Sequence, residues 1–220
     1  MKKSVLLNSG TISFFSCTNE EIPSKSKEET NISIIENKEA ILNELSDFTQ
    51  YSIKGASLFY DSSMNDVDLE KLDNYILKFN FSQAIQSRSS NKGTINYEDG
   101  LKDILSQEAY DCLSSYLATT ENITKDSFDK LKIEFSNFSK NDQEVFDLIY
   151  SSTYVIFNEL TSIDNASSRA TKNSTACNIS MALCTSAAAW AWGAAFGGIV
   201  GVAVNVAWTV AGAVAAQYTC

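Results

Sequence analysis

The sequence predicts an all-α fold, in which a small helical bundle carries a C-terminal Ala/Gly-rich helical hairpin. Between residues 36 and 163, apolar side chains recur every three or four positions, which is the period of amphipathic helices and not of strands. After Lys172 the chain has no charged side chain, and this uncharged segment is interrupted by Gly197 and Gly198. Because adjacent glycines favour a turn, we expect the end of the chain to form a helical hairpin.

The composition excludes several classes of function. The chain has 17 basic and 27 acidic side chains and a net charge of -10, whereas phosphate binding needs clustered Lys and Arg. We therefore expect no nucleic-acid partner. The sequence contains no histidine, which is the commonest general base and the commonest metal ligand. We accordingly expect a protein that is not an enzyme and that uses no cofactor and no metal.

The N-terminus has the pattern of an export signal. Two lysines are followed by a mostly apolar stretch, then by Ser16 and Cys17, and then by the acidic run TNEE. This arrangement resembles the signal peptide of a bacterial lipoprotein, and the acidic run is similar to the surface-export signals of Bacteroidetes lipoproteins. The resemblance implies that residues 1–17 form the signal peptide and that Cys17 is lipidated. It also implies export to the membrane surface of the cell envelope, as an outer-membrane lipoprotein.

The middle of the chain is expected to form the helical body. Residues 18–35 are polar and contain the only proline, so we expect a flexible tether there. Residues 36–163 are expected to hold five amphipathic helices, with a polar connection at 82–98. The expected helices cover about 36–52, a segment capped by Asn65 or Asp66, 100–118, 125–138, and a last segment that opens with Asn141 and Glu144 in capping-box spacing.

Three patterns in this body imitate catalytic or metal sites. Residues 61–70 place oxygen side chains as in a calcium loop, but the glycine and the bidentate glutamate of such a loop are missing. We interpret these side chains as helix-capping groups. Ser89 and Lys92 have the spacing found in penicillin-recognising enzymes, without the accompanying motifs. The acidic groups near Asp66, Asp126 and Asp142 are expected in first helical turns, where the helix dipole favours them.

The end of the chain is expected to be a linker, residues 164–175, and an uncharged hairpin, residues 176–220. As a single helix, residues 176–217 would be about 63 Å long, roughly twice the thickness of a bilayer core, so a break is expected. We place the turn at Gly197, Gly198 and Gly201. Each arm would then have about 20 residues and a length of about 30 Å, which matches a membrane span.

The cysteines support the same hairpin. Cys177 and Cys220 lie at similar distances along the chain from the glycine pair, so a turn there brings them together. Cys177 and Cys184 would be about 10.5 Å apart on a continuous helix, which is too far for a disulfide. In an exported protein we therefore favour a Cys177–Cys220 disulfide. Cys184 or Cys112 could replace one of these partners.

The sequence leaves open whether the hairpin enters a membrane, forms the core of the bundle or forms a partner-binding surface. Ala and Gly give a weak transfer energy, Asn205 adds a polar cost, and the tryptophans lie in the middle of the arms, away from the interface. An apolar helix pair can equally be buried by amphipathic helices. The arrangement is similar to the pore-forming domains of colicin-type bacteriocins, and the tail is similar to several small bacteriocin peptides, which implies a membrane-active element.

Two functions are consistent with these observations. The first is an exported, lipid-anchored surface protein with a bacteriocin-like hairpin that can insert into a membrane. The alternative is a non-enzymatic surface lipoprotein with a structural or partner-binding role, in which the hairpin is the buried core. In both, the membrane is reached through lipidated Cys17, and no particular protein partner is indicated.

Overall fold

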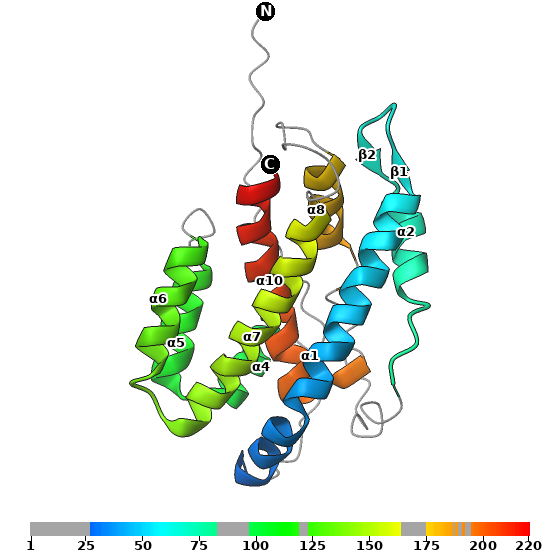
Figure 1. Ribbon diagram of the computed structural model, residues 1–220. Coiled ribbons are helices and arrows are strands. Elements are labelled where there is room, and N and C mark those ends of the chain that lie inside the picture. Colours follow the sequence, from blue (N-terminus) through cyan, green and yellow to red (C-terminus); the bar gives the residue numbers. More distant parts are fainter. Residues whose placement is uncertain are drawn as a thin grey trace, which may run out of the picture.

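Figure 1 shows a computed structural model of the chain, which describes residues 27–82, 97–118, 123–163, 175–186, 188, 191 and 195–220. Within these residues the structure has eight helices and one two-stranded antiparallel sheet, which confirms the all-α prediction. In chain order the elements are α1 (Lys27–Leu58), β1 (Tyr60–Asp61), β2 (Asp66–Val67), α2 (Leu69–Ile76), α4 (Tyr97–Ile104), α5 (Gln107–Leu117), α6 (Lys125–Phe135), α7 (Lys140–Ser162), α8 (Thr175–Thr185) and α10 (Gly198–Thr219).

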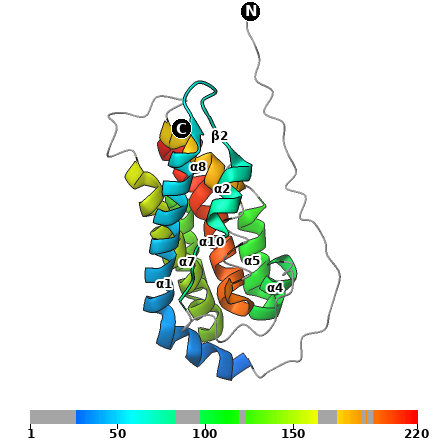
Figure 2. The same cartoon turned by 90° about the vertical axis from the view of Figure 1, so that its right-hand side faces the viewer.

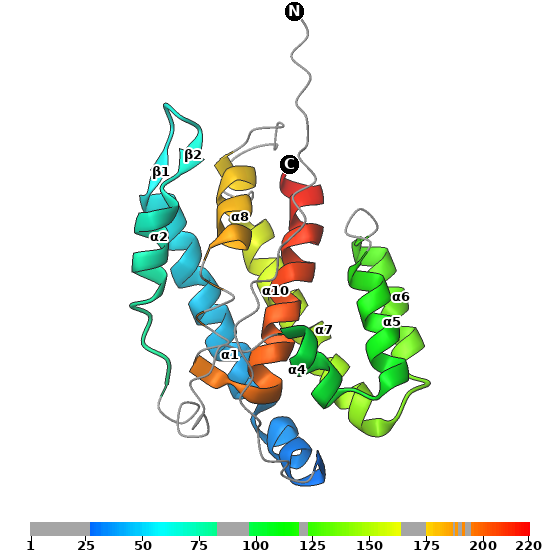
Figure 3. The same cartoon turned by 180° about the vertical axis from the view of Figure 1, so that it is seen from behind.

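The long C-terminal helix α10 lies at the centre of the bundle. It packs mainly against α7, and α8 and α4 also contact it. The first helix, α1, packs beside α7 and also contacts α2 and α8, and Figure 2 shows α1 and α7 side by side. Seen from behind in Figure 3, α10 lies between α8 and the pair formed by α5 and α6. The uncharged end of the chain is therefore packed among the helices that precede it.

The core is apolar and rich in aromatic rings. Phe135 of α6 and Phe146 of α7 stack with 3.9 Å between ring centroids. Phe48 of α1 makes an edge contact with Trp208 of α10, with centroids 6.4 Å apart, and both side chains are buried. Full burial of one such side chain contributes about 1.5–3 kcal/mol. The buried residues of α10 occupy nearly all sides of the helix: Gly201, Val202, Ala203, Val204, Val206, Ala207, Trp208, Val210, Ala211, Gly212, Val214, Ala215 and Thr219.

Side-chain caps explain where four of the helices begin. Asp68, Ser106, Thr124 and Ser139 each precede a helix and accept a hydrogen bond from a backbone N–H group of its first turn. Such caps satisfy N–H groups that have no partner within the helix. The starts of α2, α5, α6 and α7 are therefore fixed by local sequence, before any tertiary contact is considered.

Two expected boundaries in the body are wrong. Asn65 and Asp66 do not cap a helix, because they belong to the hairpin of β1 and β2, where Asn65 has a left-handed backbone with φ of 54°. The cap of α2 is Asp68 instead. The expected helix 100–118 is two helices, α4 and α5, because Ser106 is extended and caps a new helix start.

The expected tether and linker also need correction. Because α1 begins at Lys27, the second half of the expected tether, residues 18–35, is helical. Residues 1–26, with Cys17 and the signal-like pattern, lie outside the described residues. Of the expected linker, residues 164–175, Thr175 is the first residue of α8, and the positions before it are also outside the described residues.

Candidate functional site

The α8–α10 hairpin is the uncharged end of the chain, which the sequence predicts as a membrane element or as the core. A disulfide closes it. Cys177 in the first turn of α8 is bonded to Cys220, which directly follows α10. Their Cα atoms are 4.9 Å apart, within the range that a disulfide requires. This is the pairing that the cysteine spacing favours. The two alternative partners, Cys112 and Cys184, are free thiols.

The turn before α10 contains two of the three expected glycines. Gly197 and Gly198 have φ values of 56° and 49°, a conformation that favours glycine. Gly201 is not part of the turn: its N–H donates to the carbonyl oxygen of Gly197 at 3.0 Å, in the first turn of α10, and the residue is buried.

The first arm of the hairpin is interrupted at Ser186, and the described residues Ala188, Ala191, Ala195 and Phe196 beyond the break are again helical. The helix α8 has 11 residues and ends at Thr185, with Ser186 outside any helix. Its length is about 16 Å, roughly half a bilayer core. The expectation of one continuous arm of about 20 residues is therefore wrong. Positions 187, 189, 190 and 192–194, which include two of the tryptophans, lie outside the described residues.

The second arm, α10, is the one helix within the described residues that is long and apolar enough to cross a membrane. Its 22 residues correspond to about 33 Å and carry no charge. Of its most apolar stretch, 67% is buried within the protein. A central core helix and a membrane span share these properties of length and composition.

A close approach joins the two arms at Gly212. A Cβ atom added at this residue would lie 2.3 Å from Cys184 Sγ and 3.2 Å from Cys184 Cβ. The backbone of α10 therefore approaches α8 more closely than any residue with a side chain would allow. The disulfide and this contact together hold α8 and α10 close to each other at two points along their length.

Polar contacts join the outer helices to α7. Lys38 of α1 forms an ion pair with Asp147, which Lys132 of α6 approaches at 3.7 Å. Nearer the other end of α7, Glu159 accepts hydrogen bonds from Ser46 at 2.6 Å and from Gln50 at 3.1 Å. These groups are partly exposed, so they orient α1 and α6 on α7 more than they stabilise the fold.

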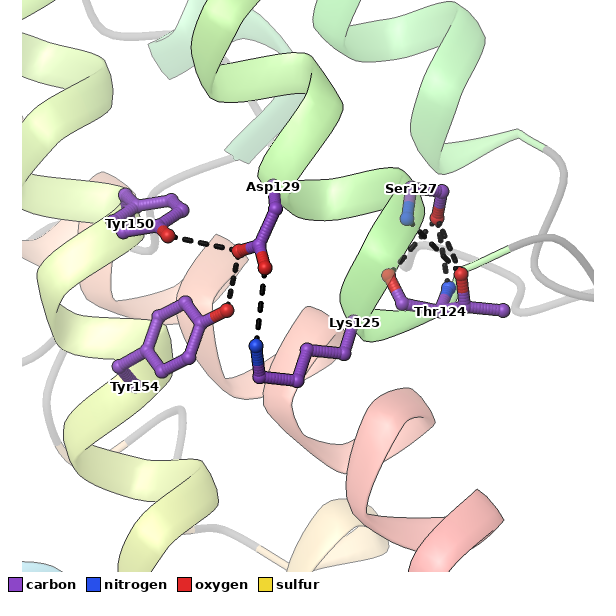
Figure 4. A network of polar contacts seen from close by, with 6 residues as sticks. All are labelled: Thr124, Lys125, Ser127, Asp129, Tyr150 and Tyr154. Carbon is purple, nitrogen blue, oxygen red and sulfur yellow. Dashed lines mark hydrogen bonds and ion pairs between the residues drawn. The ribbon is translucent and has the colours of Figure 1, made fainter.

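A second polar cluster joins α6 to α7 around Asp129 (Figure 4). One oxygen of this carboxylate accepts hydrogen bonds from the hydroxyls of Tyr150, at 2.8 Å, and Tyr154, and the other oxygen pairs with Lys125 at 3.1 Å. Burial acts to raise the pKa of Asp129, but these donors outweigh it and lower the pKa. Burial and the bond to Asp129 raise the pKa of Tyr154 to about 12.

The sequence alone does not predict this cluster. Its signal is weak, since it consists of a Lys and an Asp four residues apart and of two Tyr four residues apart on another helix. The local sequence does not show that the two pairs face each other, because they meet only when α6 packs on α7. The cluster therefore depends on tertiary structure.

Asp142 joins the starts of two helices and corrects the expected cap of α7. The helix is capped by Ser139, not by Asn141, and Asp142 Oδ2 accepts a hydrogen bond from Ser139 Oγ at 2.6 Å. Asp142 also accepts bonds from Ser106 N–H at 2.8 Å and Ser106 Oγ at 2.9 Å, at the cap of α5. Burial acts to raise the pKa of Asp142, but the hydrogen bonds from Ser139 and Ser106 lower it.

The patterns that imitate catalytic sites have structural roles or lie outside the described residues. Asp61 Oδ1 accepts bonds from the N–H and the hydroxyl of Ser63 in the β-hairpin turn. Ser89 and Lys92 fall outside the described positions. Cys112 is partly buried, and burial together with nearby Glu134 raises the pKa of its thiol, which disfavours the nucleophilic thiolate.

No candidate metal centre is found in the part of the chain that the structure describes. No group of three His, Cys, Asp or Glu side chains there could hold a metal ion. A small pocket between α6, α7 and α10 has a volume of about 10 Å³, which is enough for roughly one water molecule. Its lining residues are Lys125, Phe128, Thr153, Tyr154, Phe157 and Val214.

Fold and site together define an all-α protein with a disulfide-closed, uncharged C-terminal helix pair. No protein-family model, no curated protein and no solved structure matches the chain.

Proposed function

We propose that the chain is an exported, lipid-anchored surface protein with a non-enzymatic structural or binding role, in which the hairpin is the permanent core of the bundle. The observation that carries this proposal is the packing of α10, which is buried on nearly all sides by α7, α8 and α4. A helix that supplies so much of the core cannot leave it without exposing the inner faces of its neighbours.

The disulfide supports export. Bonds of this kind persist in oxidising compartments and are rare in the cytosol. Cys177 and Cys220 lie at the two ends of the hairpin, where the bond restrains its arms and needs no change in the packing of α10. The lipid anchor rests on a separate feature, the resemblance of residues 1–17 to a lipoprotein signal peptide with Cys17 as the lipidated residue.

Fractionation of cells that produce the full chain tests the proposal. We expect the wild type in the membrane fraction and Cys17→Ser in the soluble fraction, because the lipid is the only anchor in this account. Recovery of Cys17→Ser as an integral membrane protein, resistant to extraction at high pH, would contradict it. Cys112→Ser is the matched control and should fractionate like the wild type.

A second candidate is a bacteriocin-like protein whose hairpin acts on membranes. The observation that favours it is α10 itself, which at about 33 Å and without charge is long enough to span a bilayer. This candidate predicts leakage of dye from lipid vesicles on addition of the purified protein. Absence of leakage with both the oxidised and the reduced protein removes this candidate.

A further inference from the structure

The Lys125 ammonium lies beside a carboxylate of α6 and an aromatic ring of α7. Its Nζ lies 3.1 Å from Asp129 Oδ2 and 5.3 Å from the centre of the Tyr154 ring, as Figure 4 shows from close by. The opposite oxygen of the carboxylate accepts both tyrosine hydroxyls, from Tyr150 and Tyr154. The carboxylate is thus held in place with one oxygen turned towards the cation.

Aromatic rings continue from this point towards the end of α10. Ring centroids are 4.8 Å apart between Tyr150 and Tyr154, 6.3 Å between Tyr154 and Phe157, and 5.4 Å between Phe157 and Tyr218. Tyr218 is 55% exposed, so the row reaches the protein surface. A fixed carboxylate beside aromatic faces is the chemistry that recognises an ammonium group.

Lys125 is a weakly held occupant of the cage that Asp129, Tyr150, Tyr154 and Phe157 form. The side chains of Lys125 and Asp129 are 39% and 37% exposed, and they form an i,i+4 pair on one helix, a type of ion pair that contributes little to stability. The adjoining pocket has room for about one water molecule, so a ligand ammonium must take the place of the lysine ammonium. A displaced Lys125 would remain beside the cage as a free positive charge.

We propose that this cage, formed by Asp129, Tyr150, Tyr154 and Phe157 with Tyr218 at its rim, binds a zwitterionic ligand that joins an ammonium group to a phosphate. The ammonium replaces that of Lys125 against the carboxylate and the rings, and the displaced Lys125 pairs with the phosphate. Such a group occurs on phospholipid headgroups and on the free headgroup compounds. The proposal does not depend on the lipid anchor or on the role of the hairpin.

Calorimetric titration of the full chain with phosphocholine, choline and inorganic phosphate tests the proposal. We expect saturable binding of phosphocholine, weaker binding of choline and none of phosphate. Asp129→Asn should weaken phosphocholine binding by about tenfold or more, since the charged partner of the ammonium is lost. Lys130→Met, which changes an exposed lysine of α6, is the matched control and should bind like the wild type.

Lys125→Met gives a test that does not require Asp129→Asn to fold. It removes both the ammonium that competes for the cage and the positive charge that would pair with the phosphate. With the internal competitor removed, choline binding should become tighter than in the wild type, while the advantage of phosphocholine over choline should disappear. Vesicles of phosphatidylcholine distinguish a lipid headgroup from the free compound. Binding of Cys17→Ser to the vesicles, lost when Asp129→Asn is added, indicates the lipid. Binding of free phosphocholine without binding to vesicles indicates the soluble compound. No saturable binding of phosphocholine by the wild type, or equal binding by Asp129→Asn, would overturn the proposal.

Discussion

Asp142 links the starts of two helices, α5 and α7. It is buried, with 1% of its surface exposed, and it accepts hydrogen bonds from the caps of both α5 and α7. We expect Asp142→Asn to lower the free energy of unfolding by about 2–3 kcal/mol, because the bonds to a charged acceptor are lost while Ser106 and Ser139 stay in place. Chemical denaturation measures the change. Asp126→Asn, an exposed residue in the first turn of α6, should cost less than about 1 kcal/mol.

The same residue makes stability depend on pH. The hydrogen bonds hold the pKa of Asp142 below its value in the unfolded chain, so the unfolded state binds the proton more readily. The stabilisation is fully present above the unfolded pKa of about 4 and is lost as the pH falls through the lower folded value. Denaturant midpoints measured from pH 6 down to pH 2 should fall less steeply for Asp142→Asn than for the wild type. Parallel curves would show that Asp142 does not contribute.

Gly212 is expected to be intolerant of any side chain. Alanine normally favours a helix over glycine by about 1 kcal/mol, but here its Cβ would meet Cys184 Sγ at 2.3 Å. We expect Gly212→Ala to destabilise the protein by about 1–3 kcal/mol through this clash. In a Cys184→Ala background, from which the sulphur is absent, the same change should cost less. A double-mutant cycle by thermal unfolding measures the difference, and equal costs in both backgrounds would contradict the contact.

Among the elements, the disulfide-closed hairpin gives the clearest prediction. The bond spans 43 positions, and closing a loop of that length contributes about 4 kcal/mol in the chain-entropy model. Cys177→Ser combined with Cys220→Ser should therefore lower the free energy of unfolding by up to about 4 kcal/mol in urea. Reduction of the wild type should produce a similar loss. Cys112→Ser, which changes a free thiol, should leave the urea midpoint nearly unchanged.

The sequence predicts helices well where apolar spacing and a cap coincide. The helices α6 and α7 begin within a residue or two of their expected starts, because Thr124 and Ser139 stand directly before apolar stripes. Ser106 divides a stripe that looks continuous, since its apolar neighbours Leu105 and Ala109 are buried on both sides of the break. Periodicity alone gives no sign of this division. The hairpin of β1 and β2 was missed because each strand has only two residues.

The candidate site was only partly predictable. The Cys177–Cys220 pairing and the glycine turn follow from positions along the chain, and both are present in the structure. The end of α8 at Thr185 was not predicted, because residues 176–196 carry no charge and no proline, although the polar Thr185 and Ser186 stand at the break. The Asp129 cluster needs the packing of α6 on α7, which local sequence does not encode.

At the scale of the whole molecule, the central claim is that α10 stays in the core. Its neighbours present apolar faces to it, and Trp208 is packed against Phe48 with 2% of its surface exposed. Removing α10 would expose these faces of α1, α7 and α8 to water, at about 25 cal/mol for each Å² of apolar surface. Entry of α10 into a bilayer would return only part of that free energy, because Asn205 and Gln217 would lose contact with water or with their polar partners.

The most direct test of this claim is quenching of Trp208 fluorescence by lipids with brominated acyl chains. The lipidated protein would carry Trp190→Phe and Trp192→Phe, so that Trp208 is the only tryptophan left, and would be bound to vesicles through Cys17. If α10 is the permanent core, brominated and ordinary vesicles should give the same Trp208 emission. Strong quenching by the brominated lipids would show that α10 enters the bilayer and would contradict the account.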